Sequence, residues 1–540
     1  MPIEAVGLKL FTGIENFEIM AIPFSILAGN FLTHGGVAKR MIDFATSMIG
    51  HGTAVSALGG MACAHFAAHG AYDRGVAVVD DHAGVPRPRH LRSANLTVAA
   101  AGSRNAIGAE KGAHASPRTC GFPGPKPDQC GVLANLTVAD MSNDRAFDIL
   151  IVGAGPAGLA AALAFARDGF ETCLVGTPDA RGNGRTVALL NGSVRFLQAL
   201  GMGPLLECGV VPLVTMRIID DTGSIFRPPP ASFEASEIGL DALGWNVENS
   251  VLVKALADAA ATTSGLTLVG AYAESVDLTR DQARLRLGNG QFLRAALIVA
   301  ADGRNSRLRE SAHIATRDWA YPQAALTTLV RHDGDHDGAS VEFHTRNGPF
   351  TLAPLPGRRS GVVWVTSPNA ARRLAALDAE LLSGAIERQA RSIFGKMVIT
   401  GPTGIVPISG LSVAHYVSTR LALVAEAAHV FPPIGAQGLN LGLRDVAALR
   451  DAVVDARDCG GDIGGADAMA EYQRSRDHDV RFRTAAVDGL NRILLSDHFA
   501  LDLVRAAGLL ALGSIGPLRR AVMRETVLPM IGAPRLMRVA

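Results

Sequence analysis

The chain has 540 residues, which is enough for two or three domains with sizeable cores. Its charges nearly cancel, with 51 Lys and Arg against 50 Asp and Glu, and this balance argues against a nucleic-acid partner. The 6 cysteines include no Cys-x-x-Cys pair, so neither a zinc ribbon nor a dithiol redox motif is expected. These cysteines, and an N-terminus without a basic leader and cleavage site, favour a reduced, cytoplasmic setting.

Residues 1–72 are apolar and rich in glycine. No Asp, Glu, Lys or Arg occurs in residues 19–38, a gap of 20 residues that is about the length of a membrane-spanning helix. Pro23, Gly29 and the Gly pair at 35–36 weaken this stretch as a single span. Two interpretations stay open: one or two membrane or interfacial helices, or an apolar segment without a partner to pack on.

Residues 73–140 are rich in Ala, Gly, Pro, Arg and His and show little apolar periodicity. Such a segment buries too little apolar surface to offset its ordering entropy, so it is predicted to be a disordered linker. Just before it, His65 and His69 lie four apart in HFAAH, but no Glu follows the first His and no third ligand is evident, so no metal site is expected. A strand-like run begins soon after Met141, and we therefore expect residues 141–540 to form the functional unit.

A strand, a glycine-rich turn, a helix and a second strand are predicted over residues 147–175. The first strand is followed by Gly153-Ala-Gly155-Pro-Ala-Gly158 and then by an Ala- and Leu-rich run. In this context Gly153 makes a tight turn, Gly155 lets the backbone approach a pyrophosphate, and Gly158 lets the helix pack closely on the strand. The free N–H groups of the helix N-terminus would then face the phosphates.

The second strand of such a unit normally ends in Asp or Glu, which binds the ribose hydroxyl of the nucleotide. Here the position holds Gly176, and the nearest following acid is Asp179. Asp179, or backbone and water, remain the candidates for the ribose contact. Recognition of NAD through that acid is therefore not supported.

Two later stretches share the pattern of an apolar strand that runs into a functional turn. ALIVAADGRNSRLRE at 296–310 contains Asp302-Gly303 at the end of its strand. Residues 421–453 read as a strand, the acid Glu426, a Pro- and Gly-rich loop, and a helix from about Leu441. The positive end of that helix dipole would suit an anion, such as a reduced flavin.

Over residues 147 to about 535 the chain resembles the class A flavoprotein aromatic hydroxylases, and most of all their ubiquinone-biosynthesis branch. The glycine fingerprint, the Asp-Gly pair, the 423–445 stretch, GRTVALL at 184–190 and NGPFTLAPLPGRRSGVVWV at 347–365 carry the resemblance. The resemblance assigns FAD contacts to Gly153, Gly155, Gly158, Arg185, Asp302, Gly303, Glu426, Gly438, Leu439 and Asn440, and it places Pro432, Pro433 and Gly435 at the reacting face of the flavin. It assigns no catalytic base, and His429 is expected to pack or to form hydrogen bonds.

The resemblance implies an α/β fold: a Rossmann-like FAD-binding domain, an inserted mixed β-sheet substrate domain and C-terminal helices, behind a helical apolar N-terminal appendage. The expected FAD-binding parts are about 147–215, 245–320 and 405–455, the substrate sheet about 216–244 and 321–404, and the C-terminal helices about 466–540.

The implied chemistry is the hydroxylation of a polyprenylated phenolic precursor of ubiquinone. NAD(P)H reduces FAD, and O2 then gives a C4a-hydroperoxyflavin that transfers oxygen to the ring. A substrate of this small-molecule, lipid-like class implies an enzyme peripheral to the inner membrane, which contacts the membrane surface and other quinone-biosynthesis enzymes. The apolar, Arg-bearing C-terminal stretch is read either as an interfacial helix or as a helix packed on the catalytic domain.

Two features leave other functions open. Residues 11–51 resemble the large permease subunit of TRAP-type transporters, over about 5–68, which favours a permease fragment whose apolar segment inserts in a membrane. The second FAD motif has Ala425-Glu426 where the family usually has Gly-Asp. The alternatives are therefore a flavin-binding but catalytically impaired fusion product, or a membrane transport component.

Overall fold

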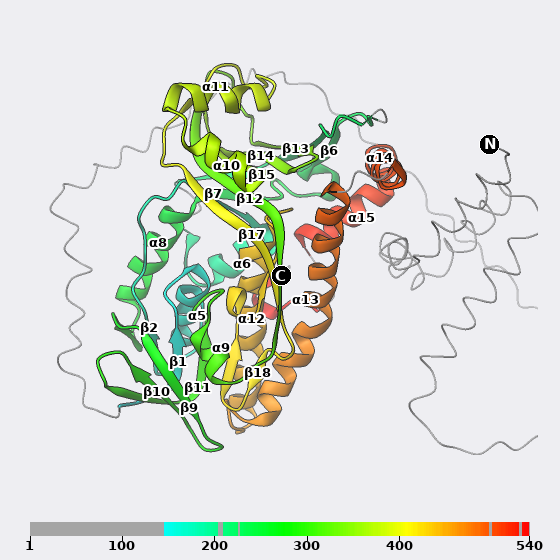
Figure 1. Ribbon diagram of the computed structural model, residues 1–540. Helices are drawn as coiled ribbons and strands as arrows, with labels where there is room; N and C mark the ends of the chain where they lie inside the picture. Colours follow the sequence, from blue (N-terminus) through cyan, green and yellow to red (C-terminus); the bar gives the residue numbers. More distant parts are fainter. Residues whose placement is uncertain (1–144, 204–208, 225–226, 496–498, 529–531, 539–540) are drawn as a thin grey trace, which may run out of the picture. The chain divides into compact units, whose positions relative to one another are not determined.

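The computed structural model describes residues 145–203, 209–224, 227–495, 499–528 and 532–538 (Figure 1). The expectations for residues 1–140, namely the apolar helices and the disordered linker, lie outside these ranges. Within the described ranges, no helix combines the length and the apolar character needed to cross a membrane.

The first sheet has the order β18-β19-β11-β1-β2-β8, and the neighbours among β19, β11, β1, β2 and β8 pair in parallel. β1 forms because its residues are apolar on both faces: Ile149, Leu150 and Ile151 are fully buried, as expected of a parallel strand covered on both sides. β9 and β10 extend β11 as an antiparallel hairpin. The strands are β1 (Arg145–Val152), β2 (Thr172–Val175), β8 (Leu266–Val269), β9 (Ala273–Leu278), β10 (Ala283–Leu287), β11 (Phe292–Ala300), β18 (Val417–Ser418) and β19 (Leu421–Leu423).

Three helices pack around this sheet: α5 (Pro156–Arg167), α8 (Asn249–Thr262) and α12 (Gln437–Asp458). α5 contacts both α8 and α12. α5 is made almost entirely of Ala, Leu and Gly, and every residue from 157 to 166 is buried. Small side chains therefore let α5 sit between the strands and the neighbouring helices.

The second sheet has nine strands in the order β20-β17-β12-β15-β14-β13-β5-β6, with β16 on β12. Helices α10 (Pro368–Ala375) and α11 (Ala379–Gln389) lie over it (Figure 1). On the face toward α11, Val341 and Phe343 pack with Leu382 and Ile386. The strands are β5 (Thr215–Asp220), β6 (Ala231–Glu234), β12 (Thr316–His332), β13 (Ala339–Thr345), β14 (Gly348–Leu355), β15 (Arg359–Thr366), β16 (Met397–Ile399), β17 (Gly404–Val413) and β20 (His429–Val430).

A small third sheet has the strand order β3 (Thr186–Leu190), β7 (Gly244–Glu248) and β4 (Val210–Leu213). Asn246 Nδ2 on β7 donates a hydrogen bond of 2.8 Å to Pro354 O on β14. At Gly361 on β15, the side chain of Thr186 occupies the space where a Cβ would lie. The third sheet is thus packed directly on the second.

The C-terminal helices pack on these sheets. In α15 (Gly516–Val527), Met523 and Val527 are buried against Phe233 and Leu243, which supports the reading of a helix packed on the catalytic domain. The remaining helices and turns are η4 (Ala235–Ile238), α6 (Asn191–Ala199), α9 (Arg307–Ser311), η5 (Ala425–Ala427), α13 (Ala466–Leu495), α14 (Phe499–Ser514) and η6 (Arg535–Met537). The expected α/β fold with a Rossmann-like sheet, a mixed sheet and C-terminal helices is confirmed for the described residues.

Tyr472 on α13 anchors this helix to the first sheet, because its buried hydroxyl donates a 2.8 Å hydrogen bond to Leu423 O at the end of β19. Tyr472→Phe keeps the ring but removes the donor, and we expect it to lower the free energy of unfolding by about 1–3 kcal/mol. Chemical denaturation measures this change. The matched control is Tyr272→Phe, at a side chain that is 63% exposed; equal effects of the two variants would contradict the prediction.

Candidate active site

The carboxyl ends of three parallel strands meet at one edge of the first sheet. Ala301 N donates to Val152 O at 2.8 Å, and Val424 N donates to Ala300 O at 3.0 Å. The residues that follow β1, β11 and β19 are therefore adjacent. In open parallel α/β sheets this edge is where ligands bind.

The glycine turn after β1 is built for close backbone contact. A Cβ on Gly153, which has φ +110°, would collide with Ala301 O, and a Cβ on Gly158 would collide with Gly153 O. At Gly155, by contrast, no atom lies within 4 Å of a Cβ position. Because α5 also lacks a side-chain cap, its first N–H groups face an open space, which fits the diphosphate of a dinucleotide.

Asp302 lies next to this turn and carries an unused acceptor. Its Oδ2 accepts a hydrogen bond of 3.4 Å from Leu308 N, while its buried Oδ1 has no partner among the described residues. Burial raises the pKa of Asp302 above its ordinary value. A buried, unpaired acceptor is costly, and it fits a hydroxyl group of a bound cofactor.

The backbone explains why no acid stands at the end of β2. Gly176 has φ +142°, and a Cβ there would lie 3.0 Å from Ala154 N, so any L-residue would be strained at this position. Asp179 is exposed, and it pairs with Arg181 at 2.8 Å between Oδ1 and Nε.

Helix α12 begins at Gln437, and the expected start at about Leu441 is wrong. Gly438, Leu439 and Asn440 therefore belong to the first turn of the helix. The sequence suggested a loop because Gly and Asn have low helix propensity. Tertiary hydrogen bonds override this preference: Asn440 Oδ1 accepts from Leu190 N at 2.8 Å, and Asn440 Nδ2 donates to Ala188 O at 2.7 Å.

The loop before α12 completes this edge. Gly435 has φ +63° and Ala436, the N-cap, has φ +55°, and no side chain caps the helix. Pro432 is buried and Pro433 is exposed. The first N–H groups of α12, including those of Gly438 and Leu439, are thus left to solvent or to a ligand.

Two of the expected cofactor contacts are side chains that point into solvent. Arg185 and Glu426 are both exposed, and in the described part of the chain neither side chain forms a hydrogen bond or an ion pair. Arg185 directly precedes β3, whose end is tied to α12 by Asn440. Glu426 lies in η5, directly after β19. Both are therefore available to a ligand.

A buried ionic cluster beneath the loop had no recognisable signal in the sequence. Asp445 accepts hydrogen bonds from His429 Nε2 at 2.6 Å, from Arg476 Nε at 2.8 Å and from Ala425 N at 3.0 Å. Burial raises the pKa of Asp445, but His429 and Arg476 outweigh it and hold this pKa below its ordinary value. The hydrogen-bonding role expected for His429 is confirmed.

Ala425 stands where the motif usually has glycine, and the neighbouring helix leaves space for its methyl group. Its φ is +54°, in the left-handed region that disfavours residues with a Cβ. A Cβ placed on Gly442 in α12 would lie only 2.6 Å from the Ala425 Cβ. Gly442 therefore leaves the space that the Ala425 methyl group fills.

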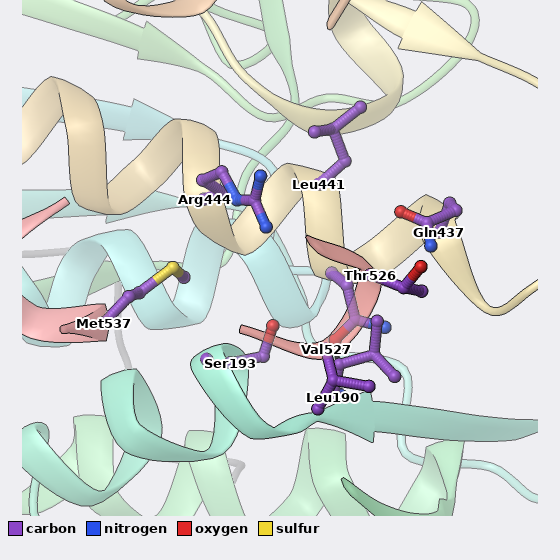
Figure 2. Close-up of a pocket in the computed structure, with 10 residues that line it drawn as sticks. Leu190, Ser193, Gln437, Leu441, Arg444, Thr526, Val527 and Met537 are labelled. Carbon is purple, nitrogen blue, oxygen red and sulfur yellow. Dashed lines mark hydrogen bonds between the residues drawn. The ribbon is translucent and has the colours of Figure 1, made fainter. Parts of the chain in front are cut away.

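A pocket lies against the first turns of α12, on the side where the C-terminal segment packs (Figure 2). It is formed by α12 together with β3, α6, α15 and η6, so the C-terminal segment helps to enclose the start of α12. Its lining consists of Leu190, Gly192, Ser193, Gln437, Asn440, Leu441, Arg444, Thr526, Val527 and Met537.

Comparison with protein families gives two separate matches. Residues 146–456 match the family described as FAD binding domain. Residues 1–69 match the DctM component of tripartite ATP-independent periplasmic transporters. The first match covers more than half of the chain, and the chain belongs to this family of FAD-dependent monooxygenases.

Individual relatives agree with this assignment. Ubiquinone hydroxylase UbiL of Rhodospirillum rubrum is 35% identical over 408 residues, covering 74% of this chain and 94% of the relative. The 3-demethoxyubiquinol 3-hydroxylase of Escherichia coli is 30% identical over 385 residues, covering 70% of this chain and 97% of the relative. These two relatives are thus matched over nearly their whole length, and this chain extends beyond the matched region.

Solved structures show the same fold at lower identity. The p-nitrophenol 4-monooxygenase PnpA of Pseudomonas putida has a TM-score of 0.60 and 17% identity, covering 71% of this chain and 98% of that one. HpxO of Klebsiella pneumoniae, complexed with FAD and uric acid, has a TM-score of 0.57 and 19% identity, covering 72% of this chain and 97% of that one.

The fit between Ala425 and Gly442 predicts coupling between these positions. In the natural background, Gly442→Ala should lower the free energy of unfolding by about 1–3 kcal/mol through overpacking. After Ala425→Gly the second methyl group has room, so we expect a coupling energy of about 1 kcal/mol or more. A double-mutant cycle by thermal and chemical denaturation measures it, and strict additivity would show that the two methyl groups do not compete.

Proposed function

We propose that the chain is the FAD-dependent monooxygenase that hydroxylates a polyprenylated phenolic precursor in ubiquinone biosynthesis, using NAD(P)H and O2. The observation that carries this proposal is the meeting of three cofactor-binding features at one sheet edge: the open N-terminus of α5, the unpaired Oδ1 of Asp302 and the uncapped N-terminus of α12. The names of the two relatives described above supply the substrate class.

Different residues at this edge bind different parts of FAD. The α5 N-terminus holds the diphosphate between Gly153, Gly155 and Gly158, and Arg185 adds a positive charge. Asp302, beside Gly303, and Glu426 accept hydrogen bonds from hydroxyl groups of the cofactor. The N-terminal dipole of α12, with the N–H groups of its first turn, stabilises negative charge on the ring.

Bound FAD supplies the redox chemistry and the activation of O2, which side chains cannot provide. The loop that contains Pro432, Pro433 and Gly435 shapes the space above the flavin ring. Its two prolines offer no backbone N–H group. The second sheet holds the substrate.

We further propose that the enzyme works at the periphery of the inner membrane, where it meets its lipid-like substrate and other quinone-biosynthesis enzymes. Apolar side chains around the junction of α14 and α15 support this: Leu510 is 49% exposed, Ile515 51% and Val522 41%. Arg520 and Arg524 lie on α15. Their positive charges would favour binding to an anionic lipid surface.

The full chain provides the first test. Purified protein should carry FAD in near-equimolar amount, seen as the flavin absorption band, and a short-chain prenylated phenol should raise its NAD(P)H oxidation and yield hydroxylated product. Protein that cannot be loaded with FAD would contradict the proposal.

Two other functions give different outcomes in the same experiment. FAD binding without hydroxylated product would identify a catalytically impaired protein, an alternative motivated by Ala425-Glu426, and Ala425→Gly would then show whether that site is the cause. The match of residues 1–69 to a transporter component motivates the third function, which requires solute uptake by vesicles that contain the full chain.

Gly155 offers a selective test of the cofactor site. Its Cβ position is open and its φ is −75°, so Gly155→Asp should fold and should cap α5 well. Its carboxylate would repel a diphosphate, and we expect FAD affinity to fall at least tenfold. Gly155→Ser is the neutral control with similar capping ability. Equal FAD affinity of the Asp and Ser variants, measured by fluorescence titration of apoprotein, would place the diphosphate elsewhere.

A further inference from the structure

A buried carboxylate–imidazole pair lies on β13 of the second sheet. Glu342 is 8% exposed and His344 is 4% exposed, and His344 Nε2 lies 2.7 Å from Glu342 Oε1. The second ring nitrogen of His344, Nδ1, is buried and has no hydrogen-bond partner among the described residues. An unpaired buried polar atom of this kind calls for a functional explanation.

The pair fixes the proton on one ring nitrogen. An ionised carboxylate only accepts hydrogen bonds, so Nε2 of His344 carries the hydrogen, and Nδ1 of the neutral ring carries a lone pair. A carboxylate that orients a histidine in this way prepares the opposite nitrogen to accept a proton.

Two other buried histidines provide a contrast: His332 at the end of β12 and His336 in the loop before β13. His332 uses both ring nitrogens, toward Gly334 O and Ser360 Oγ, each at 2.9 Å. His336 also uses both, toward Leu355 O at 2.9 Å and Gly338 N at 3.2 Å. These histidines are satisfied structural groups, whereas His344 retains a free acceptor.

The pair lies on the face of the sheet opposite α11. Val341 and Phe343 pack toward α11, so the alternation of β13 places Glu342 and His344 on the other face. Across the sheet, Glu342 pairs with Thr351 and Thr351 pairs with Val363. Thr351 and Val363 are only half-buried, so this face is partly open beside the pair.

The same face contacts the elements of the cofactor site. Gly361 lies two residues before Val363 in β15, on the same face, and it packs on Thr186 of β3. Asn440 then ties the end of β3 to the first turn of α12. The face that carries His344 is therefore the one joined, through β3, to the flavin-binding edge.

The other charged groups near the pair are engaged with one another. Asp220 on β5 is the register partner of His344, and its Oδ2 lies 3.4 Å from Arg505 Nε on α14. Arg505 also pairs with Asp502 at 2.7 Å, and Asp502 lies 3.4 Å from Arg346. Glu342 is thus the charged group bonded directly to His344.

We propose that His344, oriented by Glu342, is the hydrogen-bond acceptor and general base for the phenolic hydroxyl of the substrate. As the ring attacks the electrophilic oxygen, the phenolic O–H bond breaks and an N–H bond forms at Nδ1. Glu342 stabilises the imidazolium that results, and the electron pair left on oxygen activates the ring. This inference rests on the proposed function for the identity of the phenol.

Binding measurements test the acceptor role without turnover. Isothermal titration of the full-length, FAD-loaded protein compares 2-prenylphenol with its O-methyl ether, which lacks the hydroxyl hydrogen. The natural protein should prefer the phenol by tenfold or more, because the ether leaves Nδ1 unpaired. In His344→Gln the amide can still donate to Glu342, but no acceptor remains at Nδ1, so the preference should disappear.

Turnover measurements distinguish a His344 that only accepts a hydrogen bond from a His344 that also acts as a general base. His344→Gln should lower product formation by 10²-fold or more, and the acidic limb of the kcat/KM profile should be lost. Glu342→Gln should also lower product formation, because the neutral amide no longer stabilises the imidazolium that forms at His344. The control is His478→Gln, at an exposed position of α13.

The outcomes distinguish the two levels of inference. Unchanged phenol preference and an unchanged pH profile in both variants would overturn the role of His344. If the natural protein prefers the phenol to the ether, and His344→Gln removes this preference, but no hydroxylated product forms, the proposed function is wrong and the acceptor role of His344 stands. Melting temperature and FAD content confirm folding, and should His344→Gln fail to fold, the nearly isosteric Glu342→Gln variant decides.

Discussion

The buried carboxylate of Asp445 is the interaction on which the arrangement of the site depends. It lies on α12 and binds the backbone of η5, the imidazole of β20 and the guanidinium of α13 at the same time. A fully buried charge is tolerated only when its partners satisfy it. The loop of residues 431–436 is consequently held at its beginning by His429 and at its end by the helix that carries Asp445.

This constraint links two sheets of different architecture. The parallel sheet offers helix N-termini and strand ends, which suit a diphosphate and a charged ring. The mixed sheet offers a wide face with alternating side chains, which suits an aromatic substrate. The small β3–β7–β4 sheet packs on the mixed sheet, and Asn440 fixes its end against the first turn of α12. Segments that are far apart in the chain are therefore held together around the start of α12.

The predictable part of this site is local in sequence. The glycine fingerprint, Asp302-Gly303 and the 423–445 stretch each follow a strand directly, so their positions at one sheet edge follow from parallel pairing. The start of α12 was misjudged because Gly438 and Asn440 disfavour helices, and distant backbone groups of β3 compensate for them. The absence of an acid at Gly176 follows from a backbone angle that no composition or periodicity reveals.

The interactions that depend on tertiary packing could not be predicted from the sequence. Asp445 lies on α12 and Arg476 lies 31 residues later on α13, and nothing in either segment marks them as partners. Glu342 and His344 are close in sequence, but their significance depends on the face of β13 that they occupy and on a nitrogen that stays unpaired. Only the register of the strands and the packing of α11 establish that face.

The two-residue strand β20 has a mechanical consequence. It pairs with β17 at the edge of the second sheet, whereas α12, a few residues later, packs on α5 beside the first sheet. Residues 431–436 thus form a short connection between the two layers, and Gly435 and Ala436 in it have left-handed backbone angles. Any sliding of one layer over the other would therefore be transmitted through residues 431–436 to the first turn of α12.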